Sequence, residues 1–163
     1  MKVEGEPLEG LEHGNAWALR QPEQPSTNWV VGDHIAIPPD SLRFVRHGRS
    51  GCGPGGGSGG GGEPLEGLAI KWFQHTPEDD PGWGRGKPTS VGRTLSLLAG
   101  PGAFELSFRR DGRRCTLVLE HPGDFAIWGE GLEHRWRALE PSTVLTVRWQ
   151  HESQQRNGGT GEP

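Results

Sequence analysis

The stretch that decides the fold is Gly123–His134, which reads GDFAIWGEGLEH and is followed directly by RWRALEPSTVLTVRW. Gly123 precedes a short run of mostly apolar residues, two further glycines supply a turn, and His134 opens the next run. Glycine adopts the positive φ angles that a sharp reversal needs, so this spacing predicts a strand that crosses a barrel, a reversal and a second strand. Because side chains alternate along a strand, we expect His134 and Trp136 to share a face.

Outward from this stretch, the chain reads as short strands separated by turn residues, without an apolar stripe of helical period. The clearest neighbouring unit is the hairpin AFELSFRRDGRRCTLVLE at 103–120, where apolar and polar residues alternate and Asp111-Gly112 supplies a tight type I′ turn. The sequence therefore predicts an all-β domain. Its expected strands are Trp29–Val31, Leu42–Arg46, Leu68–His75, Arg93–Ala99, Ala103–Arg109, Arg114–Glu120, Asp124–Trp128, His134–Leu139 and Thr143–Trp149.

Glycine, proline and net charge gather outside the expected strands. The chain has 163 residues with 28 Gly and 14 Pro, and the tract GCGPGGGSGGGG at 51–62 can bury almost no apolar surface. Residues 1–25 carry a net charge of -3 and residues 151–163 a net charge of -1, while the segment between them is neutral. We therefore expect one domain at 26–150 with a Gly-rich loop insertion at 48–62, a flexible acidic tail at 1–25 and a flexible tail at 151–163.

Charge and cysteine content narrow the classes of function. A neutral domain argues against nucleic-acid binding, because such proteins concentrate positive charge on one face. Cys52 and Cys115 do not form a disulfide framework, since Cys52 lies in the glycine tract. The chain has no run of eighteen apolar residues, and its first ten residues lack the apolar core of a signal peptide. We therefore expect a cytoplasmic protein with no nucleic-acid partner and no membrane partner.

The Gly123–His134 stretch resembles the second motif of the cupin superfamily, in which a glycine opens a strand and a Pro-x-Gly turn precedes an inward histidine. Gly129 stands at the proline position, Gly131 is the turn glycine, and His134 stands at the histidine position. With KWFQH at 71–75 and LTVRW at 145–149, the chain is similar to a group of small single-domain cupins. Some members of that group carry the label signal peptidase. This sequence does not support that label, because it shows no membrane anchor beside a serine and lysine pair. The resemblance implies a single-domain antiparallel cupin-type β-barrel, a jelly roll.

The resemblance also implies where a metal would lie, and the residues there depart from the family pattern. Metal-binding cupins use two histidines and a glutamate from a first motif, together with the histidine of the second motif. Here the glutamate position falls near Arg93, and no histidine occurs between His75 and His121. Two imidazoles fall short of the three or four protein ligands of a catalytic zinc or iron site, so we expect no metal and no cofactor. A rearranged site of His75, His134 and one carboxylate from the acidic run 78–80 is the alternative.

Six side chains are candidates for contact with a ligand. Aromatic walls with a few polar groups are typical of small-molecule pockets, and an inward Lys or Arg requires an anionic partner. The alternative is that the aromatic side chains only fill the core and the cations lie on the surface. The candidates are Lys71, Phe73, His75, His134, Trp136 and Arg148.

Three functions stay open on the sequence. The first is a non-catalytic barrel that binds a small anionic or aromatic molecule, or that acts as a regulatory or interaction module. The second is a metal-dependent isomerase, dioxygenase or decarboxylase with a reduced site at His75 and His134. The third is a structural scaffold that forms a homodimer. The departures from the metal-ligand pattern favour the first.

Overall fold

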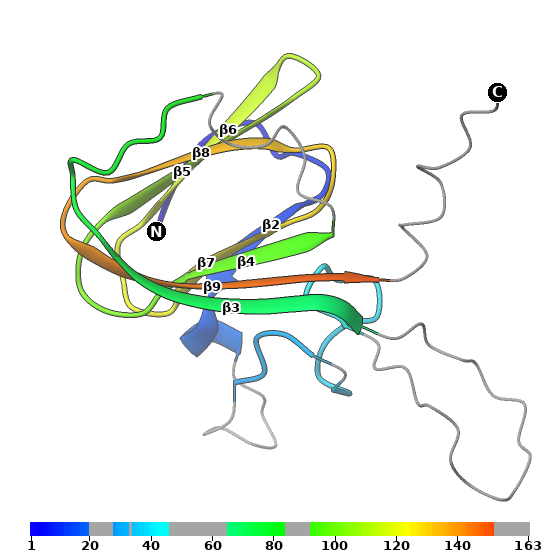
Figure 1. The fold of residues 1–163 in the computed structure, drawn as a ribbon. Helices are drawn as coiled ribbons and strands as arrows, with labels where there is room; N and C mark the ends of the chain where they lie inside the picture. The colour runs from blue at the N-terminus through cyan, green and yellow to red at the C-terminus, as the bar shows by residue number, and fades with distance from the viewer. Residues whose placement is uncertain (20–27, 33, 46–64, 84–91, 152–163) are drawn as a thin grey trace, which may run out of the picture.

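The computed structural model describes residues 1–19, 28–32, 34–45, 65–83 and 92–151 of the chain. The predicted insertion at 48–62 and all but the first residue of the predicted tail at 151–163 lie outside these ranges. The regular structure of the described residues is two antiparallel sheets and one short 3₁₀ helix (Figure 1). Within the described ranges, no helix has the length and apolar character needed to cross a bilayer.

Nine strands and the 3₁₀ helix make up the described part of the fold. In chain order they are β1 (Lys2–Gly5), β2 (Leu11–Asn15), the 3₁₀ helix η1 (Ala16–Leu19), β3 (Leu65–His75), β4 (Arg93–Leu98), β5 (Phe104–Arg110), β6 (Arg113–Leu119), β7 (Asp124–Trp128), β8 (Glu133–Ala138) and β9 (Ser142–His151).

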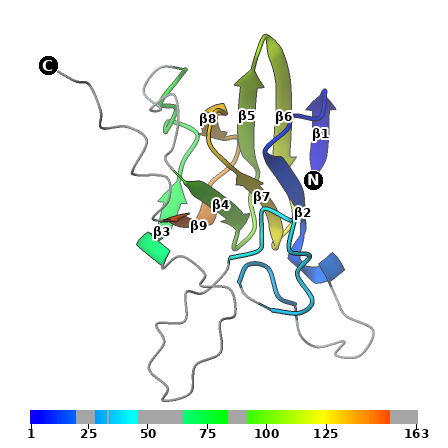
Figure 2. The same ribbon diagram turned by 90° about the vertical axis from the view of Figure 1, so that its right-hand side faces the viewer.

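The strand order is that of a jelly roll. One sheet has the order β1-β6-β5-β8, and the other has the order β2-β7-β4-β9-β3. Of the described strands, only β5 and β6 are both consecutive in sequence and hydrogen-bonded to each other. The other consecutive strands lie in opposite sheets or are separated by one or more strands of the same sheet. Figures 1 and 2 show the two sheets as facing layers, with the β5–β6 hairpin extending past the rest of the barrel. The predicted all-β fold, an antiparallel jelly roll, is confirmed.

Most of the predicted strands form where the sequence placed them. Strands β3 to β9 match seven predictions to within three residues at either end. The predicted turn of the β5–β6 hairpin is also present, because Asp111 and Gly112 have φ angles of +52° and +79°. The β7–β8 reversal contains Gly131 at φ +81°, in agreement with its role as the turn glycine.

Two predicted strands, Trp29–Val31 and Leu42–Arg46, are wrong. The described part of this segment forms one isolated bridge, between Gly32 and Phe44, and consists otherwise of turns and irregular chain. Its apolar side chains instead lie across the outer face of the five-stranded sheet, where Val45 is buried against Phe125 and Trp149. The sequence therefore could not distinguish short apolar segments that cover the face of a sheet from strands that belong to the sheet.

The N-terminal segment belongs to the folded domain, so the boundary predicted at residue 26 and the flexible tail predicted at 1–25 are wrong for residues 1–19. β1 pairs with β6, β2 pairs with β7, and Leu8 between them is buried in the core. Both strands lie at sheet edges and are rich in Glu and Gly, so they lack the apolar alternation that marks a strand in sequence. Backbone pairing with β6 and β7 holds them in place.

Apolar side chains form two layers, one on each face of the five-stranded sheet. The inner layer fills the space between the two sheets and includes Leu106, Phe108 and Leu117, all essentially inaccessible to solvent. The outer layer lies between the five-stranded sheet and residues 29–45, and includes Phe125 and Ile127. The two layers alternate along β7, which is buried at every position.

One carboxylate ties the outer cover to the sheet. Glu12 on β2 accepts hydrogen bonds from the Ser41 hydroxyl at 2.8 Å, the Leu42 amide at 3.0 Å and Nε of Arg43 at 2.7 Å. Arg93 on β4 donates from Nη1 to two carbonyls of the same segment, each at 3.0 Å. The segment is therefore fixed to two strands at once.

We expect Glu12→Gln to lower the free energy of unfolding by about 1–3 kcal/mol, because it leaves the Arg43 guanidinium, only 11% exposed, without its carboxylate. Urea denaturation of the two proteins measures the difference. The control is Glu9→Gln, because Glu9 is exposed and near Glu12 in sequence; its effect should stay within about 0.5 kcal/mol. Equal losses in both variants would contradict a clamping role for Glu12.

Candidate functional site

A small cavity lies inside the barrel, between the two sheets. Its volume is about 50 Å³, which corresponds to between one and two water molecules. Strands β3, β4, β5, β7, β8 and β9 all contribute to its walls. The titratable residues that line it are Lys71 and His75 from β3, His134 from β8 and Arg148 from β9.

Five of the six residues predicted to contact a ligand line this one cavity, namely Lys71, His75, His134, Trp136 and Arg148. The sixth, Phe73, lies at its rim and is 44% exposed. The centroid of the Phe73 ring is 4.6 Å from that of His75 and 4.5 Å from Nζ of Lys71. That these residues bind a ligand stays a prediction.

Strand alternation explains how two distant segments meet here. On β3, Lys71 and His75 face the cavity while Trp72 faces away and is 62% exposed. In the β3–β9 ladder Lys71 lies opposite Thr146, and Arg148 lies opposite Ala69. Lys71 and Arg148 are therefore diagonal neighbours on one face of two paired strands.

Sequence reasoning missed four polar residues of the cavity wall, namely Thr94 and Ser96 on β4, Trp128 at the end of β7 and Thr146 on β9. The available signal was the occurrence of two hydroxyl side chains at alternate positions of an otherwise apolar strand. Arg93, near which the glutamate position of the family pattern falls, does not line the cavity; it faces the outer side and bonds to the cover. Thr94 is the inward residue at that level of β4.

Aromatic rings surround both imidazoles. The ring centroid of His75 is 4.3 Å from that of Trp136 and 5.1 Å from that of Phe104. The centroid of His134 is 5.1 Å from that of Trp128. These contacts fix the orientation of the two rings; His75 is only 5% exposed, and His134 is partly buried.

Burial and nearby positive charge keep both imidazoles neutral at neutral pH. Burial lowers the pKa of His75, the ammonium of Lys71 lowers it further, and Asp79 opposes the change. Burial also lowers the pKa of His134, and the guanidinium of Arg148 adds to the effect. The charged groups of the cavity at neutral pH are therefore the two cations.

Four buried polar atoms in the cavity-lining residues have no hydrogen-bond partner in the described part of the chain. They are Nδ1 of His75, Nδ1 of His134, Oγ1 of Thr94 and Nε1 of Trp128. Each such atom costs about 1–3 kcal/mol when it is left unsatisfied in a protein interior. The indole N–H is a donor only, and the hydroxyl and the two imidazoles can each donate one hydrogen bond. These four atoms belong to residues that line the cavity.

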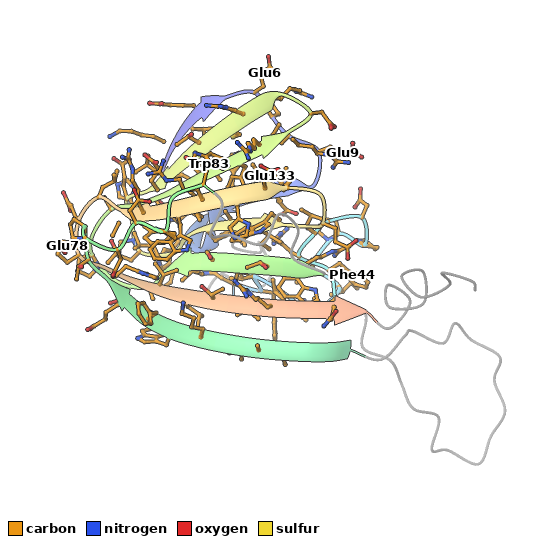
Figure 3. All side chains as sticks on the ribbon, turned by 45° about the horizontal axis from the view of Figure 1, so that its top comes forward. Glu6, Glu9, Phe44, Glu78, Trp83 and Glu133 are labelled. Atoms are coloured by element: carbon orange, nitrogen blue, oxygen red, sulfur yellow. The ribbon has the colours of Figure 1, made fainter. Side chains whose placement is uncertain are left out.

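The residues present do not fit the metal site that the cupin resemblance implies. Within the described ranges, no group of three or more His, Cys, Asp or Glu side chains is placed to hold a metal ion. Asp79 Oδ2 lies 3.9 Å from Nδ1 of His75, but its side chain is 43% exposed and does not line the cavity. Asp80 pairs with Arg135, and Glu78 lies at the turn after β3 (Figure 3). The rearranged site that includes the acidic run 78–80 is therefore not formed.

A second, larger hollow lies on the surface at the tip of the β5–β6 hairpin, with a volume of about 590 Å³. Its lining combines Arg109, Arg110 and Arg114 with two acidic residues, Asp111 and Glu133. The Arg109 guanidinium pairs with Glu133 and lies 4.7 Å from the ring centroid of Trp83. Figure 3 shows Glu133 and Trp83 beside β8. Carboxylates within this hollow offset part of its positive charge, so it is a weaker candidate than the interior cavity.

Comparison with known proteins adds a likeness of fold at low similarity. No protein-family model and no curated sequence matches the chain. Streptomyces albus HEPD with substrate 2-hydroxyethylphosphonate and Fe(II) bound matches at 19% identity over 53% of this chain and 19% of that chain, with a TM-score of 0.45. CoII HppE in complex with substrate matches at 13% identity over 50% of this chain and 44% of that chain, with a TM-score of 0.39. Hydroxypropylphosphonic acid epoxidase from S. wedmorenis matches at 11% identity over 50% and 42%, also at 0.39.

The chain spans less than half the length of each of these proteins, and the low TM-scores carry no argument about reaction, metal or substrate. Its class therefore follows from its own strand order and cavity. The protein is an all-β jelly roll with a small cavity lined by the exposed cations Lys71 and Arg148, by the buried His75 and by the partly buried His134.

Proposed function

We propose that this barrel binds a small anion in its interior, without a metal ion and without catalysing a reaction. The observation that carries the proposal is the charge of the cavity wall. Lys71 and Arg148 face the same space, and the described residues that line it include no carboxylate. Like charges on neighbouring strand positions repel each other, and a bound anion would turn this repulsion into attraction.

The polar atoms of the wall support the same ligand. Thr94, Trp128 and His134 carry buried atoms without a partner among the described residues, and each of these groups can donate a hydrogen bond. An anion accepts several hydrogen bonds at once, and hydrogen bonds to a charged group are stronger than those between neutral groups. One anion would therefore satisfy atoms that otherwise destabilise the fold.

The size of the cavity limits the ligand. Sites for drug-sized molecules have volumes of roughly 300–1,000 Å³, whereas this cavity has about 50 Å³. A halide, nitrate or formate is of the right size, or the carboxylate end of a longer molecule whose remainder lies at the rim near Phe73. Of the two ligand types expected from the sequence, the anionic one fits this volume and an aromatic ring inside the cavity does not.

We expect formate, nitrate and chloride to produce a saturable shift in the indole ¹⁵N–¹H signal of Trp128. Lys71→Gln and Arg148→Gln should each weaken binding about tenfold, which corresponds to the loss of about 1.4 kcal/mol of attraction. The matched control is Arg114→Gln, which removes an exposed positive charge at the hairpin, outside the cavity. Binding that is absent, or that weakens equally in all three variants, would contradict the proposal.

The second candidate function is a metal-dependent cupin enzyme, and it is favoured by one observation: His75 and His134 line the same cavity. We nevertheless expect purified protein to carry no stoichiometric transition metal, since two imidazoles beside two cations do not provide the ligands that hold a divalent ion. Elemental analysis measures this directly. If the protein carried about one equivalent of zinc, iron, manganese or nickel, and both His75→Ala and His134→Ala lost it, the metal-dependent enzyme would become the better-supported function.

A further inference from the structure

The two imidazoles of the cavity face different charged groups. His75 has Lys71 on its own strand, and Oδ2 of Asp79 lies 3.9 Å from its Nδ1. His134 has Arg148 as the charged group that faces it. Within the described ranges, a carboxylate is therefore at hand for only one of the two rings.

The charge balance of the cavity wall opposes a proton on either ring. Lys71 and Arg148 line the small cavity and already place two positive charges there, although both residues are also exposed to solvent. A protonated imidazole would add a third positive charge in a place where burial penalises it, in agreement with the lowered pKa of both histidines. An anion in the same cavity would supply the opposing negative charge.

We propose that the cavity takes up a small monoanion together with one proton, and that His75 is the group that accepts the proton. This inference rests on the proposed function. The His75 imidazolium would lie between the bound anion and the carboxylate of Asp79, so each of its two N–H groups would face a negative partner. His134 has no such carboxylate among the described residues and stays neutral.

The step is balanced in charge and atoms. The proton comes from solvent and moves to the free ring nitrogen of His75, while no bond of the anion breaks. The site gains one negative and one positive charge, so its net charge does not change on binding. The ligand is therefore a monoanion, and its binding with one proton amounts to the binding of the corresponding neutral acid.

The sign of the pH dependence follows from this linkage. The pKa of His75 lies below its ordinary value in the free protein and rises when an anion is bound, so the complex holds more protons than the free protein between these two values. Affinity should therefore rise as the pH falls through this interval, by up to about tenfold per pH unit. Above the pKa of His75 in the complex, and below its pKa in the free protein, the protonation of His75 should no longer make the affinity depend on pH.

The experiment is calorimetric titration of the full chain with sodium formate near neutral pH. Two cationic buffers of different ionisation enthalpy, with a bulky sulfonate counter-ion, give the number of protons taken up per formate bound. We expect a substantial fraction of one proton in the unmodified protein and in His134→Gln, none in His75→Gln, and less in Asp79→Asn. The ¹⁵N signals of the His75 ring in the unmodified protein, followed over pH with and without formate, report the same pKa change without a substitution.

The possible outcomes separate the two proposals. Formate binding without proton uptake, or with uptake that persists in His75→Gln, would overturn the proton-coupled mechanism and leave anion binding in place. A complete absence of binding of formate, nitrate and chloride across pH 5 to about 8 would overturn both. Loss of uptake in His134→Gln alone would assign the proton to the other ring and overturn the role proposed for His75.

Discussion

Replacement of Phe108 by Ala is expected to lower the free energy of unfolding by about 3–5 kcal/mol. The Phe108 ring is inaccessible to solvent, and its centroid is 5.2 Å from that of Trp128 on the facing sheet. Phe108 also lies opposite His134 in the β5–β8 ladder, directly beside the cavity. Because a domain of this size is stable by about 5–15 kcal/mol, the variant should retain only part of its stability. Chemical denaturation measures the loss.

The matched control for this variant is Phe73→Ala, the same change of side chain at the rim of the cavity. Phe73 is 44% exposed, so its truncation removes less buried surface and should cost about 1 kcal/mol. The ratio of the two losses tests whether the sheets are held together mainly through their inner layer. Equal losses would show that Phe108 is not packed as the structure describes.

The second large effect is expected at Gly102, in the turn between β4 and β5. Its φ is +126°, and a Cβ placed there would lie 2.3 Å from the carbonyl oxygen of Pro141 and 2.6 Å from Oγ of Ser142. The nearest atom belongs to the backbone, so the clash cannot be relieved by a rotation of a side chain. We expect Gly102→Ala to lower the free energy of unfolding by about 2–4 kcal/mol.

Gly112→Ala separates backbone strain from the clash. Gly112 has φ +79°, so alanine is strained there too, but nothing lies within 4 Å of the added Cβ. The expected loss is about 1 kcal/mol. Thermal and urea unfolding of both variants give the comparison, and a Gly102→Ala protein no less stable than Gly112→Ala would mean that the turn packs less closely against the start of β9.

The fold was predictable where local pattern and turn chemistry agreed. In the β5–β6 hairpin, Phe104, Leu106 and Phe108 alternate with polar residues, and Asp111-Gly112 fixes the register, so no distant part of the chain was needed. The N-terminal strands could not be predicted this way. β1 has only exposed residues and is held by hydrogen bonds to β6, which sequence periodicity does not report.

The sequence predicted the residues of the cavity only as two separate groups, one around His75 and one around His134. Alternation correctly grouped His134 with Trp136, but it could not tell whether the face of β3 that carries Lys71 and His75 lies inward or outward. That choice depends on the strand order, which places β9 between β3 and β4 and brings Arg148 beside Lys71. Arg93 shows the same limit, because a shift of one position along β4 exchanges the cavity face for the outer face.

The position of β9 also has a consequence for the newly made chain. Among the described strands β3 pairs only with β9, and β9 separates it from β4, although β3 and β4 are both synthesised long before residues 142–151. As the ribosome proceeds, β3 therefore waits with one edge, and β4 with both edges, for partner strands that have not yet been made, whereas the β5–β6 hairpin can close at once. Such unpaired edges are the parts of nascent β-proteins that associate with other chains. β9, the last of these strands to emerge, is thus the strand that links β3 to β4 and completes the wall of the cavity.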